Sequence, residues 1–205
     1  MEPIQNMTVA SYLSALGSGE AVPGGGAASA VAAAQGAALL AMSLRVSGGS
    51  DDGSRMLLSR LDTARGHLLE LATKDGAAFE SVMAALKLPR QTDEQKIHRK
   101  AAIQTALKAA AEPPMQVIRE AFSLLKDASF VVAHSKPTVV SDAGIALHLL
   151  WSAMVTARFN VWINLKSIDD ADFSTKLRED MRHMIHDGKK LRRRLSKQAR
   201  NIAGI

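Results

Sequence analysis

Residues 23–42 read PGGGAASAVAAAQGAALLAM, a proline and three glycines that lead directly into an alanine-rich run. Alanine has the highest helix propensity, and glycine lets the backbone adopt positive φ or approach a neighbouring group closely. The stretch therefore predicts a tight loop at Pro23, Gly24, Gly25 and Gly26 that feeds a helix. The unpaired N–H groups at that helix start could receive a carboxylate, a phosphate or a carbonyl oxygen. The alternative is a glycine-rich cap on a closely packed helix, because the Rossmann and Walker spacings are both missing.

Apolar residues recur at helical spacing along the rest of the chain, and no segment alternates with the period of a strand. Aromatic residues make up only 4% of the 205 residues, so small and flexible aliphatic side chains must build the core. We predict an all-α fold, an up-and-down bundle of about six or seven long helices, in a single domain over residues 1–205. Helices this long in so short a chain leave apolar sides uncovered, and we expect a homodimer.

Turn and capping residues mark the expected helix boundaries. Residues 47–53 (SGGSDDG) form a break whose aspartates can cap the next helix, and residues 92–95 (TDEQ) form a capping box. The paired prolines Pro113 and Pro114 are expected to end one helix and open another. Either Ser141 or Asp142 is expected to be the N-cap of a helix that runs to about Leu165.

The net charge of +6 is concentrated at one end of the chain: residues 174–205 carry +7, and the remainder sums to −1. This basic C-terminal helix has an apolar stripe, which favours a helix that packs on the bundle and keeps its charged face in solvent. A basic end would also attract a polyanion, either nucleic acid or a chain of glutamates. Nucleic acid is the less expected partner, since a nucleic-acid surface would spread its charge more widely.

Composition also limits the chemistry and the compartment. The chain has no cysteine, which excludes disulfides, iron–sulfur clusters and thiolate catalysis. No secretory signal pattern opens the sequence, and we expect a cytoplasmic protein. We expect no contact with a membrane, because the alanine-rich run contains Ser29, Gln35 and Ser43 and no second candidate span follows it.

Asp75 is the strongest candidate for catalysis. Residues 54–87 show two apolar rows with seven-residue spacing, one of Leu57, Ala64, Leu71, Ala78 and Ala85, the other of Leu61, Leu68, Asp75 and Val82. The second row places a carboxylate where a leucine belongs, so Asp75 is predicted to point into the helix–helix seam. A carboxylate there must be paired, protonated or in a wet functional cavity. The alternative is a purely structural aspartate that pairs with an arginine or caps another helix.

Other polar residues complete the candidate site. Asn160 and Asn164 lie four residues apart on one helix face, and inward amides need either a backbone or a ligand as partner. The six histidines form no metalloprotease motif, and we predict no metal site. No nucleophile elbow is present either. A dipolar helix start, an inward carboxylate and polar side chains suit proton transfer on a small polar heterocycle.

The sequence also resembles the cyclodeaminase domain of formiminotransferase-cyclodeaminase and the stand-alone methenyltetrahydrofolate cyclohydrolases. The resemblance spans nearly the whole chain and rests on five motifs in order: residues 23–26 with their alanine-rich helix, 75–79 (DGAAF) leading to 87–89 (KLP), 101–104 (AAIQ) with Pro113, 141–144 (SDAG), and 160–165 (NVWINL).

The resemblance implies an all-α homodimer that acts without a metal or prosthetic group on a tetrahydrofolate derivative. Apolar neighbours would raise the pKa of the Asp75 carboxyl group toward neutral pH. This carboxyl group would then move the proton when the one-carbon bridge between N5 and N10 is closed or hydrolysed. Substrate would contact Pro23, Gly24, Gly25, Gly26, Lys87, Ser141, Asp142, Asn160 and Asn164, and the basic helix would meet a glutamate chain. Because the chain carries no formiminotransferase segment, we favour the cyclohydrolase activity. The competing hypothesis is an inactive helical dimer that binds a polyanion or a protein.

Overall fold

The structure is a computed structural model that describes residues 2–205. Within this range the chain forms six α-helices and a short 3-10 turn, and no strand. Their bounds are η1 Ile4–Asn6, α1 Val9–Leu16, α2 Gly25–Val46, α3 Asp52–Leu86, α4 Asp93–His134, α5 Val140–Leu165 and α6 Ala171–Ala203. The predicted all-α fold is confirmed.

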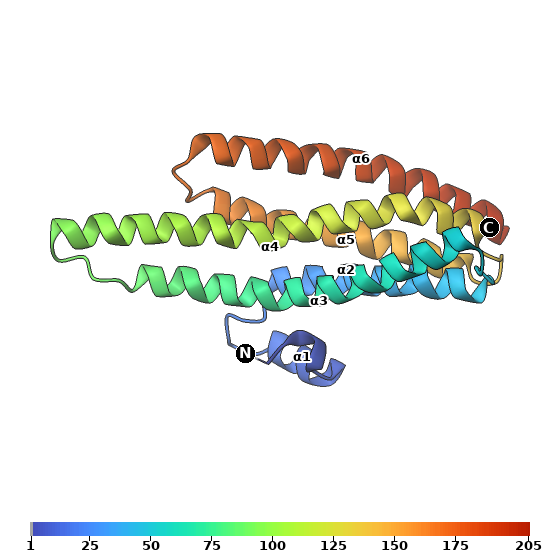
Figure 1. Ribbon diagram of the computed structural model, residues 1–205, viewed down its shortest axis with the longest axis horizontal. Coiled ribbons are helices and arrows are strands. Elements are labelled where there is room, and N and C mark those ends of the chain that lie inside the picture. Colours follow the sequence, from blue (N-terminus) through green and yellow to red (C-terminus); the bar gives the residue numbers. More distant parts are fainter. Residues whose placement is uncertain (1) are drawn as a thin grey trace.

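Four long helices, α2 to α5, run up and down and form the bundle, and α6 packs along α4 and α5 (Figure 1). Helix α1 stands apart from the bundle in the same view. The core between the helices is built mainly from alanine and leucine, as the composition predicted. Gly36 shows how close the helices come, because a Cβ atom there would lie 2.8 Å from Leu150 Cγ.

The helices differ in length, and this difference shapes the molecule. Helices α3 and α4 project well beyond the start of α2 as a free hairpin (Figure 1). Because α2 begins only at Gly25, the projecting parts of α3 and α4 have no α2 beside them. The space that α2 leaves open is the place where the candidate site lies.

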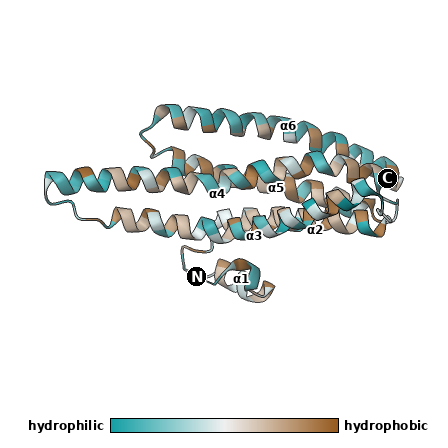
Figure 2. Ribbon diagram, in the orientation of Figure 1, coloured by the Kyte–Doolittle hydropathy of each residue, from teal (hydrophilic) through white to brown (hydrophobic). Residues whose placement is uncertain are grey.

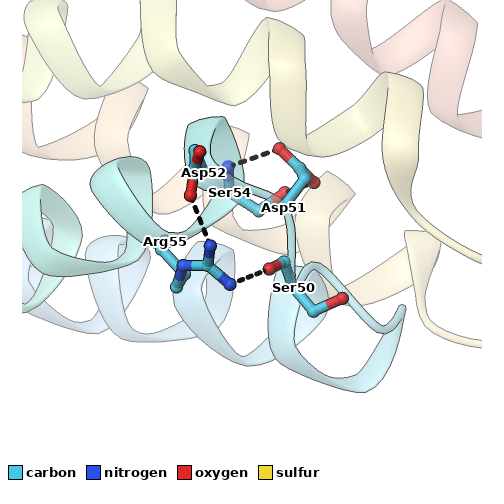
Figure 3. A network of polar contacts seen from close by, with 5 residues as sticks. All are labelled: Ser50, Asp51, Asp52, Ser54 and Arg55. Carbon is cyan, nitrogen blue, oxygen red and sulfur yellow. Dashed lines mark hydrogen bonds and ion pairs between the residues drawn. The ribbon is translucent and has the colours of Figure 1, made fainter.

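The predicted caps of α3 and α4 are confirmed. The Asp51 carboxylate accepts a hydrogen bond from the Ser54 backbone N–H at 3.0 Å, and Arg55 contacts both Asp52 and the Ser50 carbonyl (Figure 3). Thr92 and Gln95 form the complete capping box at the start of α4. These local signals could be read from the sequence because each cap involves residues within four positions.

The predicted break at Pro113 and Pro114 is wrong, because α4 continues through both prolines to His134. A proline removes one helical N–H, and the carbonyl four residues earlier loses its donor. For Pro114 that carbonyl belongs to Ala110, and it accepts a hydrogen bond from Asn164 of α5 instead. Tertiary contact thus supplies the missing donor and lets the helix continue.

The predicted N-cap of α5 is also wrong. The cap residue is Val139, which makes no side-chain capping bond, and Ser141 and Asp142 lie in the first turn of the helix. The Val139 and Val140 N–H groups donate to the Lys136 carbonyl, and the Asp142 N–H donates to the Val139 carbonyl, so backbone acceptors take the place of the expected side-chain cap. Ser141 and Asp142 are thereby left with side chains that are not used for capping.

Helix α6 is part of the fold over its whole length. Figure 2 shows hydrophilic residues predominating along it, as the basic sequence requires. Leu177, Met181, Leu195 and Ala199 are nonetheless buried against the bundle. Its basic end cannot be treated as a detachable tail, because removal of residues 189–205 would expose core side chains.

Two helices, α2 and α5, are long and apolar enough to cross a membrane by length and composition alone. The expectation that no second candidate follows the alanine-rich run is therefore wrong. Both helices contribute buried residues to the core of the bundle, which is the ordinary reason for such a composition.

Candidate active site

A cavity of about 390 Å³ lies between α3, α4 and α5, beside the start of α2. Apolar side chains form most of its wall and polar atoms come from a few positions: it is lined by Asp75, Phe79, Val82, Met83, Leu86, Ile103, Leu107, Ala110, Asn160, Ile163, Asn164 and Ser167. Ligand sites commonly combine an apolar cavity with a few fixed polar groups. Three residues predicted from the sequence, Asp75, Asn160 and Asn164, share this cavity.

The glycine loop forms the boundary of the site at the N-terminus of α2. Gly24 is the N-cap and provides no side-chain acceptor for the N–H groups that follow. The expected positive φ is not found at residues 24–26; in residues 2–205, glycines with positive φ occur at Gly48 and Gly204. Gly26 is required for a different reason: a Cβ atom there would lie 2.2 Å from Asp75 Oδ1.

Asp75 reaches this helix start from the middle of α3. Burial among apolar side chains raises the pKa of its carboxyl group above the ordinary value, and a hydrogen bond from the Ala27 backbone N–H opposes part of that rise. Asp75 thus caps another helix, one of the structural roles considered for it, and at the same time opens onto the cavity. A carboxyl group with a raised pKa in a cavity is suited to accept and return a proton.

Asn164 and Asn160 have different surroundings. The Asn164 side-chain Nδ2 donates to the Ala110 carbonyl at 2.9 Å, which satisfies the acceptor that Pro114 leaves free. The Asn160 amide lies about 4 Å from the position of a Cβ atom on Gly25. Asn164 is therefore engaged with the backbone, whereas Asn160 faces the glycine loop with its amide available to a ligand.

The remaining predicted residues do not line the cavity. Lys87 is the C-cap of α3, directly after the cavity residue Leu86, and its side chain is exposed. Pro23 is buried, while Ser141 and Asp142 lie at the opposite end of α5 from Asn160. Eighteen residues of helix separate Asp142 from Asn160, a distance of about 27 Å. Within one chain the structure does not bring Ser141 and Asp142 to Asp75.

Two groups of residues in and beside the cavity were given no role by the sequence reasoning. The first is the apolar wall formed by Phe79, Met83, Leu86 and Ile103; Phe79 and Ile103 belong to the motifs of residues 75–79 and 101–104, but no contact with a ligand was predicted for them. The second is Gln104, in the motif of residues 101–104, which lies outside the cavity lining; it donates to the carbonyl of the cavity residue Ser167 at 3.0 Å and accepts from the Asp169 N–H at 2.7 Å. Both contacts of Gln104 are more than 60 residues away along the chain, so no local pattern signals them.

The arrangement provides acid–base chemistry and orientation. Within residues 2–205 no three histidine, aspartate or glutamate side chains gather in a group able to hold a metal ion. Asp75 can move a proton, the start of α2 offers N–H donors, and the apolar wall can accommodate a flat ring system. This is the chemistry required for addition to, and elimination from, a carbon between two nitrogens.

Comparison with known proteins identifies relatives of this fold. The sequence model of formiminotransferase-cyclodeaminase matches residues 8–183. The methenyltetrahydrofolate cyclohydrolase of Methylorubrum extorquens is 31% identical over 196 residues, which cover 93% of this chain and 94% of the relative. The formimidoyltransferase-cyclodeaminase of Gallus gallus is 33% identical over 184 residues, and the match spans only 34% of that longer protein.

A solved structure agrees with these relatives. The formiminotetrahydrofolate cyclodeaminase of Thermotoga maritima superimposes with a TM-score of 0.78 at 25% sequence identity, and the match covers 98% of each chain. The family sequence model ends inside α6, so the most basic part of that helix lies beyond the matched residues.

Proposed function

This chain belongs to the formiminotransferase-cyclodeaminase family and is a folate one-carbon enzyme, and we propose that its own reaction is the hydrolysis of 5,10-methenyltetrahydrofolate to 10-formyltetrahydrofolate. The near full-length match to the Methylorubrum cyclohydrolase supports this choice of reaction. The observation that carries the mechanism is the Asp75 carboxyl, desolvated at the edge of an apolar cavity and held at the start of α2.

In the proposed mechanism Asp75 acts as general base and then as general acid. Its carboxylate accepts a proton from a water molecule as the water oxygen bonds to the methenyl carbon. When the tetrahedral intermediate collapses, the bond from that carbon to N5 breaks and Asp75 returns the proton to N5. The hydroxyl proton leaves to solvent as the formyl carbonyl forms, so one proton is released per turnover. A raised pKa suits both steps, because it lies nearer the working pH.

Neighbouring residues orient the substrate in this proposal. The N–H groups at the start of α2 hold polar atoms of the substrate ring next to Asp75, and the Asn160 amide provides a further donor and acceptor. Lys87 is exposed at the end of α3, directly after the cavity residue Leu86, and in this proposal its ammonium group meets a substrate carboxylate. Contact of the basic helix α6 with a longer glutamate chain stays a prediction.

Formiminotetrahydrofolate cyclodeamination is the second candidate, and the Thermotoga structure favours it. In that reaction N10 attacks the formimino carbon, and ammonia leaves after it receives a proton. Both reactions pass through a tetrahedral carbon between two nitrogens, so the same carboxyl group would serve either one.

Steady-state kinetics with both substrates decide between the candidates. Hydrolysis is followed by the loss of methenyltetrahydrofolate absorbance, and cyclodeamination by the appearance of the same chromophore and of ammonia. The proposal expects the larger kcat/KM for methenyltetrahydrofolate hydrolysis. A larger kcat/KM for formiminotetrahydrofolate would assign the cyclodeaminase reaction instead.

We also propose that the active form is a homodimer in the cytoplasm. Residues 21–44, which include most of α2, carry no charge, and its partly exposed positions are almost all apolar. Helix α5 adds exposed Ile145, Phe159 and Ile163. Uncharged faces of this length usually mark a protein contact. Sedimentation of the purified chain at twice its monomer mass would support the dimer, and sedimentation as a monomer would exclude it.

A further inference from the structure

A second cavity, of about 640 Å³, lies between the last turns of α5 and the first half of α6. The residues that line it are all different from those that line the Asp75 cavity. Trp162 lines this second cavity, whereas Asn164 lines the Asp75 cavity. Residues two positions apart on a helix point to nearly opposite sides of it. The two cavities are therefore separate and lie on opposite sides of α5.

The lining of this second cavity carries an excess of positive charge. Arg158 comes from α5, and Arg178, Arg182 and Lys189 recur on one face of α6 at spacings of four and seven residues. Of the described residues that line the cavity, only Glu179 is acidic, and its ion pair with Arg182 is 3.9 Å long. Four cationic groups against one carboxylate repel one another, so the cavity attracts an anion.

Arg158 distinguishes this cavity from an ordinary solvated helix face. Its side chain is half-buried, and its Nε atom is buried without a hydrogen-bond partner in residues 2–205. No carboxylate in this range forms an ion pair with it. The guanidinium carbon lies 4.4 Å from the centre of the Trp162 ring, a cation–π contact that holds the group in place. A fixed, buried donor without an acceptor is unfavourable, and a ligand oxygen would satisfy it.

Trp162 gives the same cavity a flat apolar surface. Its residue is 42% exposed although the ring is held by two neighbours, Arg158 and Phe159. The Phe159 ring meets the Trp162 ring edge-on, with 5.6 Å between the ring centres. Met181 and Ile185 of α6 add further apolar surface to the lining. A rigid aromatic ring beside guanidinium groups is suited to a ligand that combines a flat ring with an anionic group.

From these observations we propose that the cavity between α5 and α6 binds a nucleoside phosphate, with its base against Trp162 and its phosphate oxygens between Arg158, Arg178 and Arg182. Guanidinium groups bind phosphate through two parallel hydrogen bonds, so arginines on two facing helices suit such a group. The lining extends along α6 from Arg178 to Lys189, about 16 Å, which leaves room for more than the phosphates. This site is additional to the folate cavity.

Tryptophan fluorescence tests the site directly. The chain has two tryptophans, and Trp151→Phe leaves Trp162 as the only one. Titration of this variant with ADP should quench the fluorescence in a saturable manner. Calorimetry of the wild type should give one ADP per chain and a dissociation constant below about 1 mM. Absence of saturable ADP binding by both methods would overturn the proposal.

A pair of charge variants separates a built site from general attraction to a basic helix. Arg178→Gln/Arg182→Gln removes two exposed cations from the lining, and we expect the dissociation constant for ADP to rise at least ~10-fold. Arg193→Gln/Lys197→Gln removes the same charge from exposed positions of α6 outside this lining. It should change the constant by less than about 2-fold, because exposed charges act weakly at a distance. Equal weakening by both variants would show that no specific site exists.

Ligand fragments identify the class of the ligand. Adenosine and pyrophosphate should each bind more weakly than ADP, and Trp162→Leu should weaken ADP about 10-fold while it leaves pyrophosphate unchanged. Pyrophosphate that binds as tightly as ADP would contradict a contact with the base. Tighter binding of tri-γ-glutamate than of ADP would assign the cavity to the glutamate chain of the substrate instead. These titrations contain no folate, so their outcome is independent of the proposed enzymatic reaction.

Discussion

The carboxylate of Asp75 occupies the space where Gly26 would carry a side chain: an ideal Cβ atom at residue 26 lies 2.2 Å from Asp75 Oδ1. The two residues are 49 positions apart in the sequence, on α3 and α2. Their contact joins the desolvated carboxyl group to the N-terminus of a helix, and it defines the polar end of the cavity.

Replacement of Gly26 is expected to disable the enzyme, whereas replacement of a glycine away from the site should not. In Gly26→Ala the methyl group displaces the Asp75 carboxyl, and we expect kcat to fall by roughly 100-fold, because small misplacements of catalytic groups are costly. Gly66→Ala, on α3 but away from the site, is the control, since a Cβ atom there would meet nothing within 4 Å. Equal losses of kcat in two folded variants would argue against the close contact as the cause.

The role of Asn164 is predicted to be structural. In Asn164→Leu the buried Ala110 carbonyl loses its donor, and we expect the free energy of unfolding to fall by about 1–3 kcal/mol. Restoring a backbone N–H with Pro114→Ala should make the same Asn164→Leu change much less costly. Denaturant unfolding of the four proteins in this cycle measures the coupling, and additive effects would show that Asn164 does not serve the proline gap.

Asn160 is predicted to act on the substrate and not on stability. Its amide faces Gly25 at the mouth of the site, so Asn160→Ala should raise KM or lower kcat by about 10-fold, the loss of one good hydrogen bond. The unfolding midpoint should stay close to that of wild type. A large loss of stability with unchanged kinetics would reverse the roles assigned to Asn160 and Asn164.

Asp75 should cost the fold stability at neutral pH. Burial raises the pKa of Asp75 in the folded state, so the protonated carboxyl group contributes to the free energy of unfolding. This contribution is fully present below the unfolded-state pKa and is lost as the pH rises through the folded-state pKa. Asp75→Asn stays neutral at every pH, and we expect it to melt above wild type at neutral pH. The difference should shrink as the solution is made acidic, which thermal unfolding at several pH values measures.

The pH–rate profile should report the same group. General-base catalysis needs the ionised carboxyl, so kcat/KM is expected to fall as the pH drops through the raised pKa of Asp75. The midpoint of this acid limb should lie above the ordinary range of an aspartate. A limb within that ordinary range would indicate that a solvated carboxylate, not Asp75 in its apolar surroundings, controls the reaction.

Much of the fold was predictable because its signals are local. The alanine run, the Thr92 capping box and the Asp51 cap each act within a few residues, and each formed where it was expected. The predicted helix break at Pro113 and Pro114 does not form. The carbonyl that Pro114 leaves without a donor accepts a hydrogen bond from Asn164, which is more than 50 residues away in the sequence. Sequence patterns report what one segment favours, and they do not report what a distant side chain supplies.

The candidate site was predictable in part for the same reason. Asp75 broke an apolar row and was visible as an anomaly, while the contact that requires Gly26 depends on how α2 and α3 meet. Phe79, Met83 and Leu86 lie outside the two apolar rows, and no pattern within α3 shows that α2 begins only at Gly25 and leaves this part of α3 open as a cavity wall.

The most direct test is the absorbance of methenyltetrahydrofolate over time, with wild type, Asp75→Asn and the control Glu80→Gln, which changes an exposed carboxylate on the same helix. We expect wild type and Glu80→Gln to hydrolyse the substrate at similar rates, and Asp75→Asn to be slower by at least ~100-fold while it stays folded. Wild-type turnover that survives in Asp75→Asn would contradict the role of Asp75. A wild type inert toward this substrate and toward formiminotetrahydrofolate would contradict the folate function itself.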